Sequence, residues 1–330
     1  MQTPLKDALT QPNFIWRGIS WQDRKPWLTI EPLTHQGPSG QTQRLPLASG
    51  DYLGFEVIPE SQPQAGTYCA GYSAARAESI SFETRPCPDS RLISKGKQCD
   101  TCLARDEFAP IHRVHLGARM TEAALAYANL PHYLYVATFP DGSSKVGTAS
   151  LHSNPRRLDD QAVAAATFVA KAQTGLLVRQ LEDLVSQEAN LTQFKHSSTK
   201  YKGWLAPAPA GQIASEHYMA VENATWALED AQEELEGFEI LEDRWQAPEL
   251  MGRAHQALVE GVRQPLAAYP DVLEGPQGFL LQGATGKFLT VQATAGQEPV
   301  FLVNTLPLAN RACRLAEGLS LPDAVEAPLF

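Results

Sequence analysis

Four of the five cysteines lie in one segment of the chain, and their spacing suits a metal ion. They are Cys69, Cys87, Cys99 and Cys102, and the last two form a Cys-x-x-Cys knuckle in a polar loop. Four thiolates satisfy the tetrahedral preference of Zn²⁺, and a two-residue gap lets two ligands bind from one tight turn. A redox pair or buried free thiols are the alternatives, but a redox Cys-x-x-Cys usually opens a helix after a strand. We therefore expect these four residues to hold a structural zinc ion.

A second group of reactive side chains lies in the stretch HYLYVATFPDGSSKVGTA, residues 132–149. Two short apolar runs flank a Pro-Asp-Gly-Ser turn, which predicts a β-hairpin. Tyr133 and Tyr135 share one face of the first strand because successive side chains alternate between the two faces. The second strand carries Lys145 and Gly147. The hairpin therefore holds polar groups that packing alone does not require.

Charged residues follow the hairpin in two predicted helices. Arg156 and Arg157 precede a helix expected over residues 159–173, and a second helix is expected over residues 176–191. Glu182 lies at the edge of the apolar stripe of the second helix and is therefore half shielded from solvent.

Each of these residues also has a purely structural interpretation. The two tyrosines can be half-buried aromatic residues, and the two arginines can be solvated loop charges. Glu182 can form an ion pair with Arg179 or Lys171, and Glu188 is a rival for the buried acid.

The order of these residues resembles the GIY-YIG endonuclease superfamily. It is most similar to an uncharacterised bacterial domain-of-unknown-function family that joins a cysteine zinc ribbon to a KVG-variant GIY-YIG module. Tyr135 in HYLYVA matches the tyrosine of the first motif, and KVG (145–147) stands for the second, with Lys145 in place of its tyrosine. Arg157 matches the helical arginine, and Glu182 in QLEDLV matches the metal-binding glutamate. The match covers residues 130–195, and the cysteines extend it back to residue 69.

The resemblance implies metal-dependent cleavage of a nucleic-acid phosphodiester. Tyr135 would be the general base, and the permanently charged fork of Arg157 would stabilise the phosphate. Glu182 would offer a hard oxygen ligand to Mg²⁺ or Mn²⁺. Lys145 would assist the tyrosine or hold a phosphate. The remaining substrate contacts would come from Tyr133, Gly147 and Arg156.

Charge is distributed unevenly along the 330 residues. The formal net charge is −10, yet residues 85–205 carry 15 Lys and Arg against 11 Asp and Glu, and residues 206–330 carry 6 against 18. Because an acidic surface repels phosphates, we expect DNA or RNA to bind the basic middle of the chain. The acidic C-terminal region would bind a basic protein partner or mask the basic segment.

The elements that must position these residues indicate an α+β protein with four parts. Residues 1–65 are β-rich, and residues 66–110 form the zinc-ribbon segment. Residues 111–205 would be the GIY-YIG-like domain, a small antiparallel sheet flanked by helices. A Pro/Ala stretch at 204–211 leads into an acidic α+β domain over residues 206–330.

The sequence argues against a membrane protein and leaves two alternatives to a nuclease. No window approaches the ~20 apolar residues of a membrane span, and the N-terminus does not resemble a secretory signal. We therefore expect a cytoplasmic protein. The first alternative is a zinc-containing DNA- or RNA-binding module of the same fold that cuts nothing. The second is an interaction protein that works through its acidic C-terminal domain.

Overall fold

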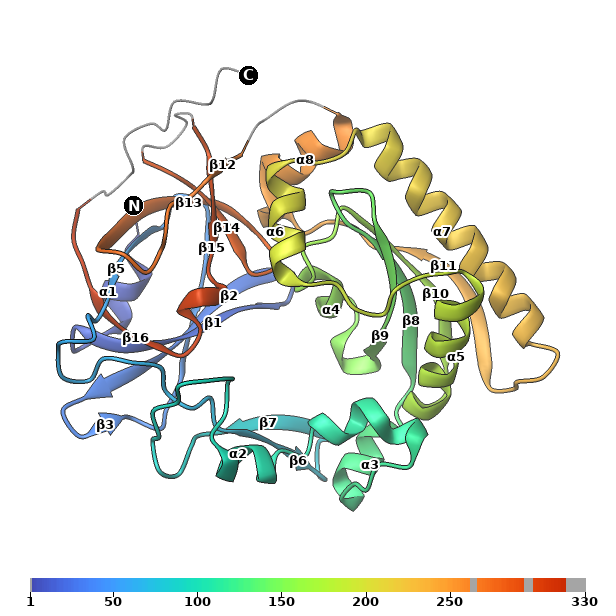
Figure 1. The fold of residues 1–330 in the computed structure, drawn as a ribbon, viewed down its shortest axis with the longest axis horizontal. Helices are drawn as coiled ribbons and strands as arrows, with labels where there is room; N and C mark the ends of the chain where they lie inside the picture. Colours follow the sequence, from blue (N-terminus) through green and yellow to red (C-terminus); the bar gives the residue numbers. More distant parts are fainter. Residues whose placement is uncertain (1, 262–265, 294–298, 319–330) are drawn as a thin grey trace.

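The computed structural model of the chain describes residues 2–261, 266–293 and 299–318. In this part of the chain it has eight α-helices and three β-sheets (Figure 1), which confirms the α+β class. No helix among these residues is both long enough and apolar enough to cross a membrane.

The largest sheet has ten strands and is built from both ends of the chain. Its order is β12-β15-β14-β13-β5-β16-β1-β2-β3, with β4 paired to β2. The bounds are β1 (Asn13–Gln22), β2 (Lys25–Thr34), β3 (Gly37–Pro38), β4 (Gln43–Pro46), β5 (Tyr52–Val57), β12 (Ala267–Ala268), β13 (Pro276–Thr285), β14 (Phe288–Gln292), β15 (Phe301–Asn304) and β16 (Arg311–Leu315). In this sheet β1 lies beside β16, with Phe14 opposite Cys313. The structure therefore joins strands of the predicted parts 1–65 and 206–330 in one sheet.

A second sheet of four antiparallel strands has the order β11-β10-β8-β9. The strands are β8 (His132–Thr138), β9 (Ser144–Ser150), β10 (Ala165–Ala172) and β11 (Phe238–Arg244). The expected hairpin at 132–149 is β8 and β9. The helix expected over 159–173 is wrong, because α4 covers only Arg156–Asp159 and the following residues form β10. β10 lies between β8 and β11 and is buried along most of its length, so cross-strand packing of its Thr-Phe-Val centre outweighs the helix propensity of its alanines.

The two faces of the four-stranded sheet pack against different partners. Leu134 and Val136 face the helices α5 (Gly175–Glu188) and α7 (Ala210–Ala231). Tyr135 and Ala137 alternate with them and join the core of the larger sheet, in one cluster with Trp21. The two sheets therefore share one hydrophobic core and form a single packed body.

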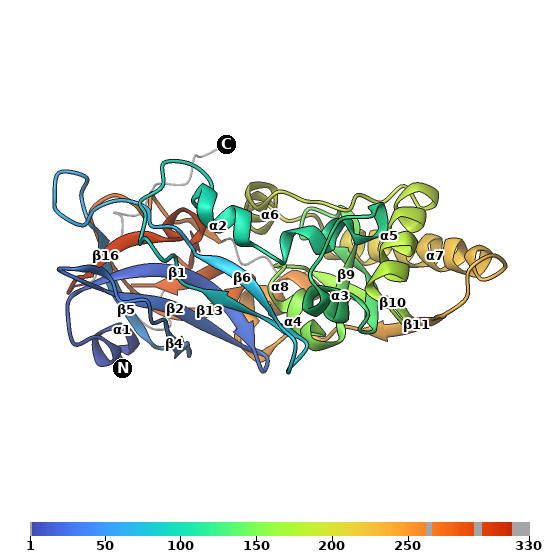
Figure 2. The ribbon, with the colours of Figure 1, turned by 90° about the horizontal axis from the view of Figure 1, so that it is seen from below.

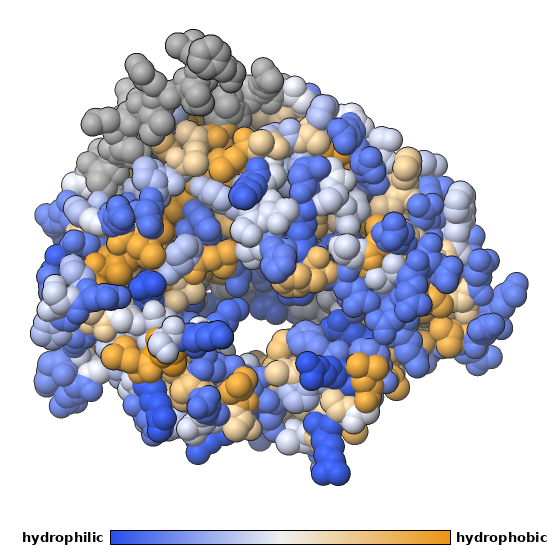
Figure 3. Space-filling view, viewed as in Figure 1, coloured by the Kyte–Doolittle hydropathy of each residue, from blue (hydrophilic) through white to orange (hydrophobic). Residues whose placement is uncertain are grey.

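The segment that contains the four cysteines connects the two sheets along one side of the molecule (Figures 1 and 2). It comprises β6 (Tyr72–Arg76), β7 (Ser81–Arg85), α2 (Asp100–Arg105), the 3₁₀ segment η1 (Ala109–Leu116) and α3 (Glu122–Ala128). The Thr121 hydroxyl caps α3 by accepting from the Ala124 backbone N–H at 3.3 Å. Figure 3 shows an opening through the molecule between this segment and the rest of the chain.

The remaining helices are short and lie around the two sheets. They are α1 (Pro4–Ala8), α6 (Ser197–Leu205) and α8 (Gly252–Glu260), with 3₁₀ turns η2 (Leu151–Ser153), η3 (Glu249–Met251) and η4 (Leu306–Leu308). The Pro/Ala stretch predicted as a linker separates α6 from α7 by only four residues, 206–209. The helix α4 is tied to the turn between β1 and β2, because the Trp21 backbone N–H donates to Asp160 Oδ1 at 3.2 Å.

Candidate metal centre and cationic cluster

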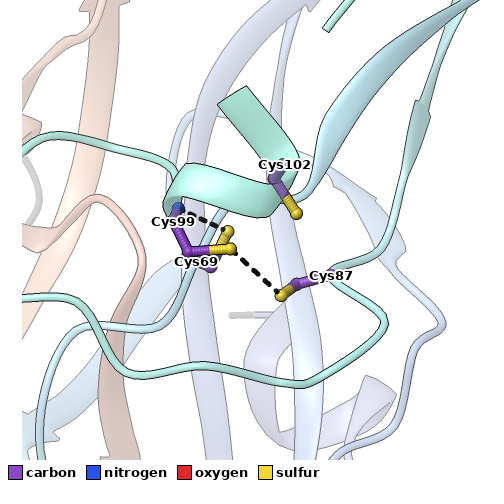
Figure 4. Close-up of side chains that lie close together, drawn as sticks. All are labelled: Cys69, Cys87, Cys99 and Cys102. Carbon is purple, nitrogen blue, oxygen red and sulfur yellow. Dashed lines mark hydrogen bonds between the residues drawn. The ribbon is translucent and has the colours of Figure 1, made fainter. Parts of the chain in front are cut away.

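The four cysteines predicted as metal ligands converge on one point. Their sulfur atoms all lie within 4.8 Å of one another, and all four residues are buried. Cys99 immediately precedes α2 and Cys102 lies in its first turn, so the knuckle expected in a loop opens a helix. Cys69 and Cys87 come from loops (Figure 4). The Cys87 and Cys99 sulfurs are 3.9 Å apart. A tetrahedral ion with bonds of ~2.3 Å places its sulfurs roughly 3.8 Å apart, so the cluster fits a metal such as zinc.

Backbone groups around the sulfurs support a ligand role. Cys69 Sγ accepts from the N–H groups of Cys99 at 3.2 Å and Gly71 at 3.4 Å. Burial raises the pKa of the Cys102 thiol, whereas a hydrogen bond from the Cys102 backbone N–H lowers the pKa of Cys99 to about 7. Thiolates are the metal-binding form, so metal uptake at this centre releases protons.

Tyr135 and Gly147 form a packed cross-strand pair. Tyr135 is fully buried, and its hydroxyl has no hydrogen-bond partner among the residues that the structure describes. Its ring lies across the backbone of Gly147, because a Cβ atom at that position would be 2.6 Å from the Tyr135 Cζ and Oη atoms. A glycine is therefore required at 147 by the tyrosine ring beside it.

Lys145 lies on the same face of the hairpin as Tyr135. Its Nζ is 5.5 Å from the centre of the Tyr135 ring, and the residue is only 5% exposed. The structure therefore brings together three of the residues singled out from the sequence, namely Tyr135, Lys145 and Gly147.

Lys145 is also one member of a wider group of cations. Burial, followed by the charges of Lys145, Arg157, Lys195 and Lys287, lowers the pKa of Lys200 to about 7. Lys200 Nζ donates to Gln161 Oε1 at 2.7 Å and lies 4.9 Å from the centre of the Phe139 ring.

Lys287 links this group to the cysteine-containing segment. It sits in the turn between β13 and β14, and Lys97 and Arg157 add to burial in lowering its pKa. Lys97, Arg157 and Lys287 are all exposed to solvent. We call Lys97, Lys145, Arg157, Lys200 and Lys287 the cationic cluster.

The cationic cluster contains little compensating negative charge. Asp160 is the carboxylate that lies among these residues, since Lys287, Arg156 and Arg157 all oppose the rise in pKa that burial causes in it. Lys195, next to the cluster, is neutralised separately by Asp141 at 2.6 Å. In the part of the chain that the structure describes, no ion pair neutralises any of the five members of the cluster.

Glu182 lies apart from Tyr135 and Lys145. It is buried on α5, which covers the sheet face opposite to Tyr135, and its carboxylate accepts from Arg179 at 2.5 Å. Arg179 also contacts His112 Nδ1 at 3.1 Å. Burial and the charges of Arg179 and Arg157 lower the pKa of His112 to about 4.

The other predicted contact residues have contrasting environments. Tyr133 is half-buried, and its ring packs edge-on against Phe168 with centroids 5.5 Å apart. Arg156 is exposed on α4 beside Arg157.

Sequence reasoning missed Lys97, Lys200 and Lys287. Lys287 lies in the acidic final third of the chain, and only the pairing of β13 with β5 and β14 carries it to this site. A signal for two of them is present in the sequence, because residues 85–205, which include Lys97 and Lys200, contain more cations than anions.

Comparisons of the chain with protein-family models, with curated proteins and with solved structures found no match.

Proposed function

We propose that this protein binds nucleic acid through the cationic cluster. The observation that carries the proposal is the convergence of five cations from five separate segments, with no ion pair to any of them among the described residues. Gathering like charges is unfavourable, and the charges of Lys145, Arg157 and Lys287 add to burial in lowering the pKa of Lys200. An anionic ligand relieves this repulsion, and a phosphate backbone supplies several charges at regular spacing.

We further propose that the four cysteines hold a structural zinc ion. Lys97 is two residues before Cys99, so an ion at this centre would fix the position of the Lys97 backbone. The segment itself has a small apolar core, made of the cysteines with Tyr72 and Ile93. Metal ligation would therefore supply much of its folding free energy.

The test is a binding titration with single-stranded DNA, duplex DNA and single-stranded RNA. Removing one phosphate contact by Arg157→Ala or Lys287→Ala should weaken binding of every sequence and reduce the slope of log Kd against log salt by about 1. Lys6→Ala is the matched control, because Lys6 is an exposed cation on α1, paired with Glu317 and outside the cluster. No binding by the wild type at 50 mM salt, or equal losses for the control and the cluster variants, would contradict the proposal.

Phosphodiester cleavage at the same place is a second candidate. It is favoured by the 5.5 Å contact between Lys145 and the Tyr135 ring, and by the unpartnered Tyr135 hydroxyl. Catalysis by the residues named from the sequence requires Glu182 to exchange Arg179 for Mg²⁺ or Mn²⁺, and requires Tyr135 to become accessible to substrate.

A nicking assay separates cleavage from binding. Supercoiled DNA and structured RNA are incubated with Mg²⁺, Mn²⁺ or chelator. A nuclease should lose cleavage but keep binding in Glu182→Gln and Tyr135→Phe, because both changes preserve shape and remove one catalytic function. Binding by the wild type without cuts on any substrate would leave binding as the function.

A further inference from the structure

The loop between α5 and α6 carries an exposed aromatic ring beside the cationic cluster. Phe194 is 69% exposed, and its ring meets the His196 ring edge-on with centroids 4.8 Å apart. Its neighbours in sequence are Gln193 and Lys195. A single exposed apolar side chain is ordinary, so its significance depends on what lies around it.

Hydrogen bonds hold this loop against β9, α5 and the turn between β8 and β9. The Val146 N–H donates to the Thr192 carbonyl at 3.0 Å, which places the loop beside Lys145. Gln193 Nε2 donates to Asp183 Oδ1 at 2.7 Å, and Lys195 Nζ donates to Asp141 Oδ2 at 2.6 Å. Phe194 is thus flanked on both sides by residues with fixed partners. A ring presented in this way loses little conformational entropy when a ligand binds it.

Two cations meet at one ring near this loop: Lys195, which belongs to the loop and pairs with Asp141, and Lys200, a member of the cluster. Lys195 and Lys200 both lie over the Phe139 ring, at 5.0 and 4.9 Å from its centre. Lys200 is in turn close to Lys145 and Arg157. The exposed ring therefore belongs to a loop that is bridged, two residues before Phe194, to Lys145 of the cluster.

Proteins that bind single strands combine these two features: cations follow the backbone, and aromatic rings stack on unpaired bases. The bases of a duplex are stacked on one another and leave no free face for a ring on the protein surface. We propose that Phe194 is a stacking platform for an unpaired base of single-stranded DNA or RNA whose phosphates contact the cationic cluster. This inference rests on the proposed nucleic-acid binding and names its substrate class.

The experiment compares Phe194→Ala, Phe194→Leu and Phe194→Trp in titrations with labelled single-stranded DNA, single-stranded RNA and duplex DNA. Phe194→Ala and Phe194→Leu should weaken single-strand binding by about 5- to 150-fold, the range of one lost base–aromatic stack. Phe194→Trp should keep it. The salt slope should not change, since no charge is removed. Tyr218→Ala is the matched control, because Tyr218 is an aromatic residue on α7 that is 61% exposed.

Two further arms isolate stacking from other effects. A strand in which all bases are replaced by abasic sites should bind wild type and Phe194→Ala equally, as should duplex DNA. If Phe194→Ala weakens the binding of only single-stranded DNA or only single-stranded RNA, the affected strand is identified as the natural ligand. Either result supports the stacking platform. If wild type and Phe194→Ala bind a single strand that carries its bases with equal affinity, this inference is overturned and the proposed function stands. Equal losses on duplex and single strand also overturn it. No binding of any nucleic acid by the wild type overturns the proposed function itself.

Discussion

The affinity for nucleic acid should depend on pH through Lys200. The half-buried position of this lysine is the largest cause of its low pKa, and the neighbouring cations of the cluster lower it further, to about 7. Half of the Lys200 side chains are therefore neutral near pH 7 in the free protein. A bound phosphate favours the ammonium form, so binding takes up a proton at neutral and higher pH.

The size of the effect follows from this pKa. Below pH 6 Lys200 is already charged, and affinity should be nearly constant. Above pH 7 each unit should weaken binding up to about tenfold, since one unit of pKa shift corresponds to about 1.4 kcal/mol. Between pH 6 and 8.5 the dissociation constant should rise about tenfold to thirtyfold. His112 and His217 do not contribute in this range, because burial lowers the pKa of each to about 4.

The assay is a fluorescence-anisotropy titration at constant ionic strength between pH 6 and 8.5. Lys200→Arg should bind with little dependence on pH, because a guanidinium stays charged throughout. Lys200→Gln should bind weakly, also with little dependence on pH. If Lys200→Arg keeps the slope of the wild type, another group takes up the proton and the reasoning about Lys200 is wrong.

Three further predictions concern stability and the metal. Wild-type protein should contain about one zinc per chain, and a chelator or Cys87→Ser should lower the melting temperature and weaken nucleic-acid binding through the displaced loop of Lys97. Tyr135→Phe should leave the free energy of unfolding in urea unchanged or raise it by about 1 kcal/mol, because it removes a buried hydroxyl without a partner. Burial raises the pKa of Asp159 to about 6, although Arg24 and Trp245 donate to its Oδ1 atom. The native state therefore binds more protons than the unfolded state between pH 4 and 6, and Asp159 lowers stability by up to about 1.4 kcal/mol per unit as pH rises there. Asp159→Asn should abolish that component of the pH dependence in urea unfolding.

Features that depend on local chemistry could be predicted from the sequence. The four cysteines converge as a four-ligand metal centre would require, and their number and the Cys-x-x-Cys pair are visible in one short segment. The hairpin at 132–149 and the helix α5 follow from turn residues and apolar periodicity within about 20 residues.

Features that depend on pairing between strands far apart in the sequence could not be predicted. No residue near Phe14 indicates that it lies opposite Cys313. The sequence therefore does not predict that the two ends of the chain share one ten-stranded sheet. The sequence of residues 159–173 favours a helix, and only the position of residues 165–172 between β8 and β11 makes them a strand. Lys287 joins the cationic cluster for the same reason, through the pairing of β13.

The residues that resemble a nuclease motif divide into two physical classes. Tyr135 and Gly147 are explained by packing, since the buried ring of one excludes a side chain at the other. Lys145 and Arg157 are not explained by packing, because one is a nearly buried cation without an ion pair and the other is an exposed member of the same cluster. Maintaining unpaired like charges lowers stability, whereas maintaining a tyrosine beside a glycine does not. The charged members of the motif are therefore the stronger indication of a ligand, and they favour phosphate binding whether or not Glu182 ever releases Arg179 to hold a metal ion.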